Sequence, residues 1–323
     1  MKNQKRLSMS ICPFLFVTYS SFVFTLSFAG SLAAGETNIE GIGAFGPAEK
    51  LHTDFQFTEG PASDGQGNLY FTDIPANRIY KLDPSGNKDV FIEPSGHANG
   101  LMIDGNGNLI ACQMDGQVVS FHIKTKEASI LAKSYMQQRF NAPNDLVIDK
   151  SGGVYFTDPH YRAPMPLPQR TMAVYYRAGN GFVSRLIDDL DAPNGVMLSP
   201  DEKTLYVIPT QQEKMMVYPV ESPGVLGEGK VFCTLKQPEG KTGRGGDGLT
   251  MDEKGNLYIT SGLGLQIVSP AGKLLGILEF PEQPANVTFG GPDNKTLYVT
   301  ARTSLYKMSA PVAGHRFTGK ASE

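Results

Sequence analysis

The chain has 323 residues, of which 40% are hydrophobic, and its formal net charge is −3 at pH 7. This mildly acidic balance argues against a nucleic-acid-binding protein. The 36 glycines and 22 prolines favour many short strands and turns over long helices. One large all-β domain fits this length and composition.

Residues 1–34 are predicted to be a signal peptide. Three cations stand in the first six residues, and an apolar run follows from about Met9 to Phe28. This order is typical of secretion signals, and cleavage near residues 29–34 predicts a secreted or periplasmic protein. Because the run is long for a signal core, a retained anchor is the alternative. No later stretch is apolar enough to predict another membrane contact.

A single pattern recurs six times along the remaining chain, most clearly in Asn144–Thr157, NDLVIDKSGGVYFT. Each copy has a polar opening residue, a short apolar run, a turn that is often Asp-x-x-Gly, and a second apolar run. The openings are spaced 39 to 53 residues apart. Repeats of this length, each with about four strands, are the signature of a β-propeller. We therefore predict a six-bladed β-propeller, with four-stranded antiparallel blades around a central channel.

The two ends of the repeat region are predicted to meet. The last repeat offers three strands, and the segment Glu49–Phe57 reads as a strand that supplies the fourth. This pairing would close the ring and remove the open sheet edge. The propeller would then span residues 48–311, preceded by a flexible lead-in, 35–47, and followed by a disordered tail, 312–323.

The opening position of the repeat is never apolar and never positively charged. Its occupants are Glu59, Asn99, Asn144, Asn194, Asp247 and Asn286. Since each opens the innermost strand of its blade, six-fold repetition predicts that all six surround the channel at one mouth. Two long loops, Pro159–Thr171 and Leu235–Gly246, belong to the same face and are predicted to cover that mouth.

Crowded acids at this mouth predict a bound cation. The carboxylates of Glu59 and Asp247 would repel each other, and a divalent ion would compensate them. Carboxylate and amide oxygens suit Ca²⁺ best, with Mg²⁺ or Mn²⁺ as alternatives, and Zn²⁺ stays open. Asparagine and aspartate also cap turns at strand starts. Six such residues in register, two of them acids, favour one divalent metal cation over capping alone.

A divalent ion with open coordination positions can polarise a carbonyl or activate water. Asp247 is then the predicted general base, so the ring suits hydrolysis of an ester or lactone. The sequence has no Gly-x-Ser-x-Gly motif that would mark a serine nucleophile. His97, His160 and Arg244 fall on the same face and are candidate substrate contacts, although solvated side chains are the alternative.

Five segments of the chain carry a family resemblance that spans roughly Glu49–Met308. They include FQFTEGPASDGQGNLYFTDIPANRIYKLD, APNDLVIDKSGGVYFTDP and GDGLTMDEKGNLYIT. The sequence resembles the gluconolactonase, senescence-marker-protein and luciferin-regenerating-enzyme family. That resemblance implies a six-bladed propeller with one divalent cation in its channel, and lactone hydrolysis as the activity.

The resemblance also implies roles for the opening residues. The metal ligands fall on Glu59, Asn144, Asn194 and Asp247, with Asp247 also the base. Asn144 is alternatively a substrate contact beside the ion. Asn99 and Asn286 would contact water or substrate hydroxyl groups on the same ring.

Three positions depart from the family pattern. Ala142 stands where some members carry an arginine used on the substrate, and Met114 and Pro209 replace residues that are commonly polar. These positions lie near the mouth, so they affect the expected sugar specificity more than the metal.

The sequence therefore predicts a metal-dependent lactonase that acts on a sugar lactone or a related cyclic ester. The expected partner is a small-molecule lactone, and the expected state is a monomer or weak dimer. The alternatives are an arylesterase-like hydrolase and a non-catalytic, metal-stabilised binding propeller in the cell envelope.

Overall fold

The computed structural model describes residues 35–317. The predicted signal peptide, 1–34, and the last residues of the predicted tail, 318–323, lie outside the described part. Every regular element within 35–317 is a β-strand. No helix that could cross a membrane occurs among these residues.

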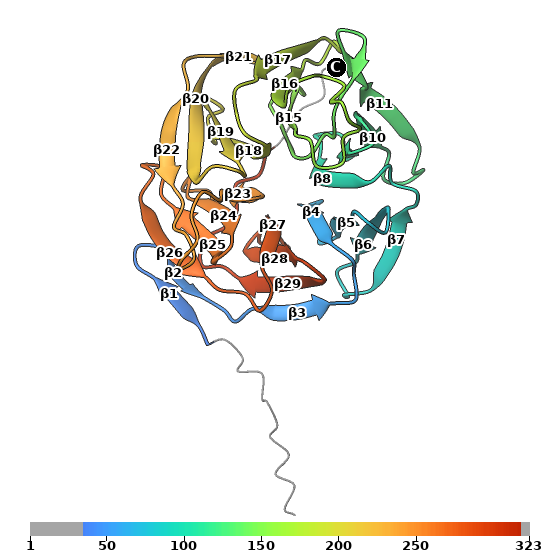
Figure 1. Cartoon of the computed structure of the whole chain (residues 1–323). Helices are drawn as coiled ribbons and strands as arrows, with labels where there is room; N and C mark the ends of the chain where they lie inside the picture. The colour runs from blue at the N-terminus through green and yellow to red at the C-terminus, as the bar shows by residue number, and fades with distance from the viewer. Residues whose placement is uncertain (1–34, 318–323) are drawn as a thin grey trace, which may run out of the picture. The chain divides into compact units, whose positions relative to one another are not determined.

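The strands form six blades around a central axis, and the first strand of each blade is innermost (Figure 1). Blade one contains β4 (Thr58–Ser63), β5 (Leu69–Asp73), β6 (Arg78–Leu82) and β7 (Lys88–Ile92), and blade two contains β8 (Ala98–Ile103), β9 (Leu109–Gln113), β10 (Gln117–Phe121) and β11 (Ala128–Ala132). Blade three contains β14 (Leu146–Ile148), β15 (Val154–Asp158), β16 (Ala173–Arg177) and β17 (Val183–Ile187). All neighbouring strands within these blades are antiparallel.

Blades four to six follow the same plan. Blade four contains β18 (Pro193–Leu198), β19 (Thr204–Pro209), β20 (Lys214–Ser222) and β22 (Lys230–Thr234), with the short β21 (Val225–Leu226) on the long β20. Blade five contains β23 (Leu249–Met251), β24 (Leu257–Ser261), β25 (Gly264–Val268) and β26 (Leu274–Leu278), and blade six contains β27 (Pro284–Gly290), β28 (Thr296–Ala301) and β29 (Ser304–Ser309). The six-bladed prediction is confirmed.

Blade six is completed by the other end of the chain. Its outer strand is β3 (Glu49–His52), which pairs antiparallel with β29, with His52 opposite Leu305. This confirms the predicted ring closure, in which the start of the repeat region pairs with its end.

The Tyr-x-Thr sequence that ends several second strands joins neighbouring blades. The Thr72 hydroxyl donates to the carbonyl of Asn99 at 3.2 Å, and the Thr157 hydroxyl donates to the carbonyl of Asn194 at 2.8 Å. Both threonines are fully buried. Each thus satisfies a backbone carbonyl of the next blade close to the channel, where an unpaired carbonyl would be costly.

The Asp-x-x-Gly turns lie at the opposite ends of the innermost strands. In one of them, the Asp104 carboxylate accepts the backbone N–H groups of Asn106 at 2.9 Å and Asn108 at 2.8 Å. Asp252 caps its turn in the same way. The repeated aspartate is therefore a turn cap, as the side-chain oxygen replaces a backbone acceptor.

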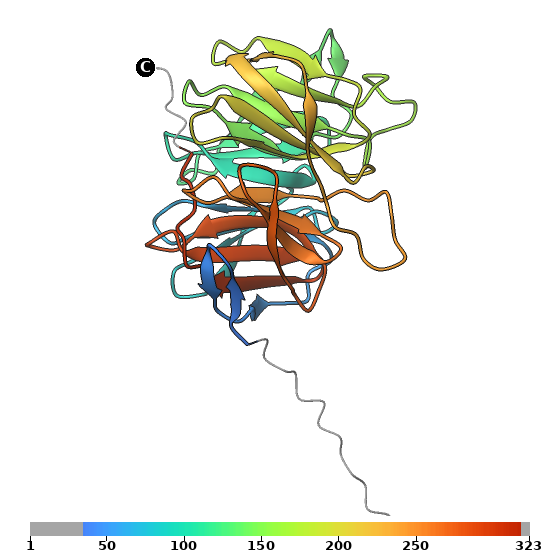
Figure 2. The ribbon, with the colours of Figure 1, turned by 90° about the vertical axis from the view of Figure 1, so that its left-hand side faces the viewer.

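Residues 35–47 differ from the predicted flexible lead-in. They form a hairpin of β1 (Thr37–Ile39) and β2 (Gly43–Phe45) beside blade five (Figure 2). The hairpin is held because Ile39, Ile42 and Phe45 are buried in the cluster that includes Tyr258 and Leu265. Burial of three large apolar side chains offsets the entropy of ordering this segment.

Residues 312–317 likewise differ from the predicted disordered tail. Gly314 bridges to Asp252, and the N–H of His315 donates to the carbonyl of Met251 at 2.8 Å. Val312 is buried in the same cluster as Phe289. The segment thus docks on the turn side of blades five and six.

Candidate active site

The innermost strands are irregular where they carry the opening residues. Glu59, Asn99, Asn194 and Asn286 lie near the starts of β4, β8, β18 and β27, and strand pairing shifts at each of these points. Asn144 and Asp247 precede β14 and β23. Such bulges re-aim side chains and are common beside active sites.

Glycines after the opening residues allow neighbouring blades to approach closely. A Cβ atom on Gly195 would lie 2.5 Å from the carbonyl oxygen of Asp247, and one on Gly100 would lie 2.7 Å from that of Asn144. The N–H groups of these two glycines donate to the same carbonyls, at 3.0 and 2.7 Å. The absence of side chains at these positions keeps the ring of opening residues narrow.

Two of the predicted ligands form a tight pair between blades four and five. Asn194 Nδ2 donates to Asp247 Oδ1 at 2.6 Å. Burial raises the pKa of Asp247 to about 6, while the Asn194 hydrogen bond and the positive charge of Arg302 act in the opposite direction. At neutral pH this carboxyl group is mainly ionised and can accept a proton.

Glu59 lies across the channel from this pair, and its side chain is only 3% exposed. Burial raises the pKa of Glu59 well above its usual value, and the nearby charges of Asp247 and Asp145 raise it further. The Gly60 N–H and the Asn286 side chain hydrogen-bond to it and partly offset this effect. Glu59, Asn194, Asp247 and Asn286 are thus brought together as predicted.

Asp145 is a third buried acid of the channel and was not among the predicted residues. Burial raises its pKa to about 7, and the charge of Asp247 contributes in the same direction. The repeat held a signal for it. The position after the opening residue is glycine in four repeats and Val287 in another, so a carboxylate there stands out.

The donor set of the ring fits a hard divalent cation. In residues 35–317, no group of three or more His, Cys, Asp or Glu side chains could hold a metal by itself. A cation would therefore need asparagine amide oxygens beside the carboxylates, which is a donor mixture that calcium accepts. Glu59 and Asp145 are buried and Asp247 is partly buried, and the mutual repulsion of these three acids gives the electrostatic reason for such an ion.

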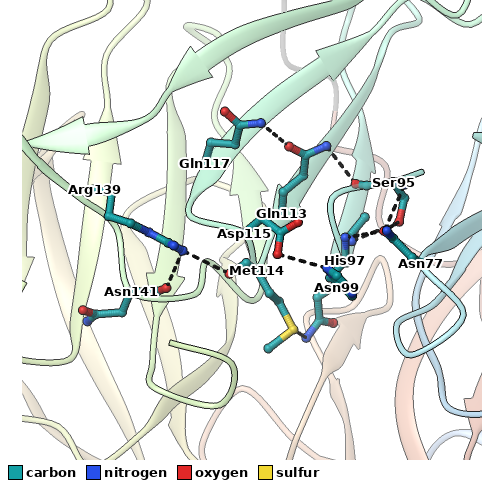
Figure 3. Close-up of polar contacts among 11 residues, drawn as sticks. Asn77, Ser95, His97, Asn99, Gln113, Met114, Asp115, Gln117, Arg139 and Asn141 are labelled. Carbon is teal, nitrogen blue, oxygen red and sulfur yellow. Dashed lines mark hydrogen bonds and ion pairs between the residues drawn. The ribbon is translucent and has the colours of Figure 1, made fainter. Parts of the chain in front are cut away.

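The remaining opening residues also border the channel. Asn144 is buried beside Asp145, and its carbonyl accepts the N–H of Gly100. Asn99 is buried in blade two, where its amide contacts the sulfur of Met114 at 3.9 Å (Figure 3). Met114 thus occupies space beside a predicted substrate contact.

The three candidate contacts outside the ring have different surroundings. His97 Nδ1 lies 3.0 Å from Asp115 Oδ1 (Figure 3), and His160 Nδ1 lies 2.8 Å from the sulfur of Met172. Arg244 is exposed in its loop, and only its backbone carbonyl has a described partner, Gln237 Nε2 at 2.7 Å.

The positive charge of Arg302 lowers the pKa of Asp247. Arg244, the basic residue predicted from the sequence, does not contribute to this effect. Arg302 belongs to the turn between β28 and β29 and is exposed. Its guanidinium group lies 5.4 Å from the ring centre of Phe57 and donates to Gln283 at 2.8 Å. The repeat distinguishes Arg302, whose equivalents are not basic, but the local sequence does not show that its charge acts on Asp247.

The loop 159–171 reaches over the mouth as predicted. Ala163 packs against the buried cluster of Ile74, Met114 and Ala142, which belongs to blades one to three. At the other side, the Tyr161 hydroxyl accepts a hydrogen bond from Asn194 Nδ2 at 3.5 Å. Tyr161 was not predicted, since nothing in a proline-rich loop shows which side chain turns inward.

A cavity of about 470 Å³ occupies the channel on the other side of the ring. Gly60, Asp145 and Asn286 line its inner end, and the docked residues His315–Phe317 line it near the turns. Tyr161 and Asp247 do not line it. The candidate active site is therefore the loop-covered mouth, which is separate from this cavity.

Comparison with known proteins finds lactonases among the relatives of this chain. The chain is 30% identical over 294 residues to a gluconolactonase of Zymomonas mobilis, covering 83% of this chain and 82% of the relative. It is 27% identical over 258 residues to the pentonolactonase XacC of Haloferax volcanii, covering 77% and 83%.

A solved gluconolactonase from Xanthomonas campestris superposes with a TM-score of 0.75 at 28% identity, covering 82% of this chain and 90% of that one. Residues 57–303 match the model of the SMP-30/Gluconolactonase/LRE-like region. This match includes all six opening residues and every strand of the blades except β3 and β29 of blade six. The chain therefore belongs to the SMP-30/gluconolactonase/LRE-like family.

Proposed function

We propose that this protein is a divalent-metal-dependent lactonase that opens a sugar lactone at the loop-covered mouth. The observation that carries this proposal is the short hydrogen bond between Asn194 and the partly buried, ionisable Asp247, set opposite Glu59. The names of the relatives, a gluconolactonase and a pentonolactonase, support the substrate class.

Glu59, Asn144, Asn194 and Asp247 are the residues that would hold the cation, with Asp145 beside them. Bound there, a divalent ion would supply Lewis-acid polarisation of the lactone carbonyl. The all-oxygen donor set favours Ca²⁺ among the candidate ions.

Asp247 acts as the general base in this proposal. Its carboxylate accepts a proton from water as the water oxygen attacks the lactone carbonyl carbon. The bond from that carbon to the ring oxygen then breaks, and the proton passes to the ring oxygen, which leaves as a hydroxyl group. The product is the open-chain hydroxy acid. The Asn194 hydrogen bond orients the carboxylate, and Tyr161 limits access of bulk water.

Acid release from a panel of aldonolactones and aryl esters tests this proposal. The purified protein is assayed after chelation and after addition of Ca²⁺, Mg²⁺, Mn²⁺ or Zn²⁺. We expect aldonolactone hydrolysis to stop on chelation and to return with one of the ions. Chelation that leaves full turnover would overturn the metal dependence. Turnover of aryl esters alone would favour an arylesterase-like enzyme, and no turnover with any ion would favour a binding propeller.

A further inference from the structure

We propose that Arg302 binds a carboxylate carried by the lactone, so that the mouth selects acidic sugar lactones over neutral ones. This inference rests on the proposed lactonase function and names the substrate class of that site. A monolactone of an aldaric acid has the required chemistry, with a lactone carbonyl at one end and a free carboxylate at the other.

The first argument is the place of Arg302 in the repeat. It directly follows the second strand of its blade, at the point where the chain turns at the mouth. The residues in this position in blades one to six are Ile74, Met114, Pro159, Thr210, Gly262 and Arg302. Only the occupant in blade six is charged, so the positive charge at this level of the mouth is confined to one blade.

The second argument is the neighbours of Arg302, which place it beside the ring of opening residues. Its backbone carbonyl accepts the N–H of Thr58 at 2.8 Å, and Glu59 follows Thr58 directly. Its guanidinium group lies 5.4 Å from the ring centre of Phe57. Phe57 in turn packs against the same buried cluster as Ala163 of the covering loop. Blade six also lies next to β4 of blade one (Figure 1), so Arg302 borders the loop-covered mouth.

The third argument is that the turn around Arg302 is held in one conformation. Arg302 has a φ of +48°, which is uncommon for a residue other than glycine and persists where surrounding contacts enforce it. The Glu282 carboxylate accepts the N–H of Thr303 at 2.9 Å and its hydroxyl at 2.8 Å. Gln283 Oε1 accepts a guanidinium N–H of Arg302 at 2.8 Å. A side chain that is already ordered in this way loses less entropy when it binds a ligand.

The fourth argument is that the charge of Arg302 has no acidic partner. None of the ion pairs in residues 35–317 involves this side chain. Gln283 is neutral, and the nearby Glu282 pairs with Lys50 at 3.4 Å instead. The bond to Gln283 uses one of the five guanidinium N–H groups, and the described residues provide no other side-chain or backbone acceptor. Because Arg302 is exposed, a ligand can reach the remaining donors.

An arginine with free donors is suited to a carboxylate, which it can bind through two parallel hydrogen bonds. One guanidinium group also matches the single negative charge of a carboxylate. In the proposed complex, the lactone carbonyl lies at the ring of opening residues and the carboxylate at the far end of the substrate contacts Arg302. A neutral aldonolactone has a hydroxymethyl group at that end and makes no charged contact.

The test compares two lactones in variants of the full protein with its cation. One is a monolactone of an aldaric acid, and the other is the aldonolactone of the same ring size and configuration, in which a hydroxymethyl group replaces the carboxylate. Arg302→Gln removes the charge, and Arg302→Lys keeps the charge without the planar pair of donors. Arg78→Gln is the control, since Arg78 lies at the same end of blade one but is paired with Glu93 at 2.9 Å.

The measured quantity is the kcat/KM for the acidic lactone divided by that for the neutral lactone. This ratio cancels any effect of Arg302 on Asp247, because both substrates use the same base. We expect a ratio above one for the wild type. Arg302→Gln should lower the ratio by about tenfold to a hundredfold, the range for hydrogen bonds to a charged group, and Arg302→Lys should lower it less. Arg78→Gln should leave it within about twofold of the wild type.

An unchanged ratio in Arg302→Gln would overturn the proposal. An equal fall in Arg78→Gln would also overturn it, because the charge of the whole face would then explain the preference. A phosphorylated aldonolactone that the wild type prefers to the acidic lactone, and that Arg302→Gln no longer prefers, would overturn the assignment to a carboxylate. Thermal melting of each variant checks that the fold is retained.

Calorimetry separates this inference from the lactonase proposal. The open-chain aldarate and aldonate differ only in the second carboxylate. If the wild type hydrolyses no lactone but binds aldarate more tightly than aldonate, and Arg302→Gln abolishes this difference, the lactonase proposal fails and the arginine site stands. If the wild type is an active lactonase and Arg302→Gln binds aldarate as tightly as the wild type, the arginine site fails alone.

Discussion

The amide of Asn194 donates a hydrogen bond of 2.6 Å to the carboxylate of Asp247, and this contact joins blades four and five at the channel. The same amide lies 3.5 Å from the Tyr161 hydroxyl of the covering loop. The proposed base, the amide that contacts it and the covering loop therefore meet at one point.

Asp247→Asn is expected to lower kcat by about a hundredfold to ten-thousandfold, the usual contribution of a general base. The fold should remain, because the change removes a partly buried charge and keeps the shape of the side chain. Steady-state kinetics and thermal melting would measure both effects. Asp189→Asn, at an exposed position of blade three, is the matched control. Near-normal turnover of Asp247→Asn would remove Asp247 as the base.

The stability of the chelator-treated protein is expected to fall as pH rises from about 5 to about 7.5. Burial raises the pKa of Asp145 to about 7 and that of Asp247 to about 6, above the usual value of 3.8. Over this window the folded protein holds protons that the unfolded chain has lost, so increasing pH favours unfolding. Melting temperatures across the window, with and without added cation, would measure this.

Added cation should make the stability of the protein depend less on pH, because the cation stabilises the ionised carboxylates. The Asp247→Asn variant should also show a shallower slope without any cation, since one of the titrating groups is gone. A melting temperature that increases with pH in the chelated wild type would contradict the assignment of raised pKa values to these acids.

Tyr161→Phe is expected to reduce kcat/KM by about fivefold to tenfold, because the substrate site loses one hydroxyl group that hydrogen-bonds beside Asp247. Cation affinity should be unchanged, since Tyr161 is not a proposed ligand. Kinetics and calorimetric titration of the cation would separate the two effects. Tyr218→Phe, on β20 of blade four, removes a phenolic hydroxyl elsewhere and serves as the control. Unaltered kinetics in Tyr161→Phe would place the tyrosine outside the site.

Thr157→Val is expected to destabilise the protein by about 1–3 kcal/mol. The hydroxyl of Thr157 donates to the carbonyl of Asn194 at 2.8 Å and accepts the N–H of Asp145 at 3.1 Å, so valine leaves two buried backbone groups unpaired. Urea denaturation would measure the loss.

Thr250→Val is the control for this change. Thr250 is also buried, but its hydroxyl makes no hydrogen bond to the described residues, so the substitution should be close to neutral. Equal destabilisation by the two substitutions would show that hydrogen bonding between blades is not the cause.

Sequence alone predicted the propeller because each blade is a local unit. Alternating apolar residues, Asp-x-x-Gly turns and a polar opening recur at a period that only one architecture accommodates. The register also placed Glu59, Asn194, Asp247 and Asn286 on one ring, since equivalent positions of equivalent blades must lie at the same height in the channel.

The repeat pattern did not predict the structure of the segments outside it. The ordered parts of 35–47 and of the chain after Pro311 depend on surfaces that distant blades provide, such as the pocket around Phe45. Composition shows neither that surface nor the burial that stabilises these segments, so Gly- and Ala-rich stretches looked flexible.

The sequence by itself thus determined the number of blades, the closure of the ring and the ring of opening residues, because all three follow from local periodicity. Only the tertiary structure decided which loop side chains complete the mouth. Tyr161 contacts Asn194, and the charge of Arg302 acts on Asp247, through backbone paths that no period describes. The buried environment that raises the pKa of Asp145 likewise arises only when all six blades enclose the channel.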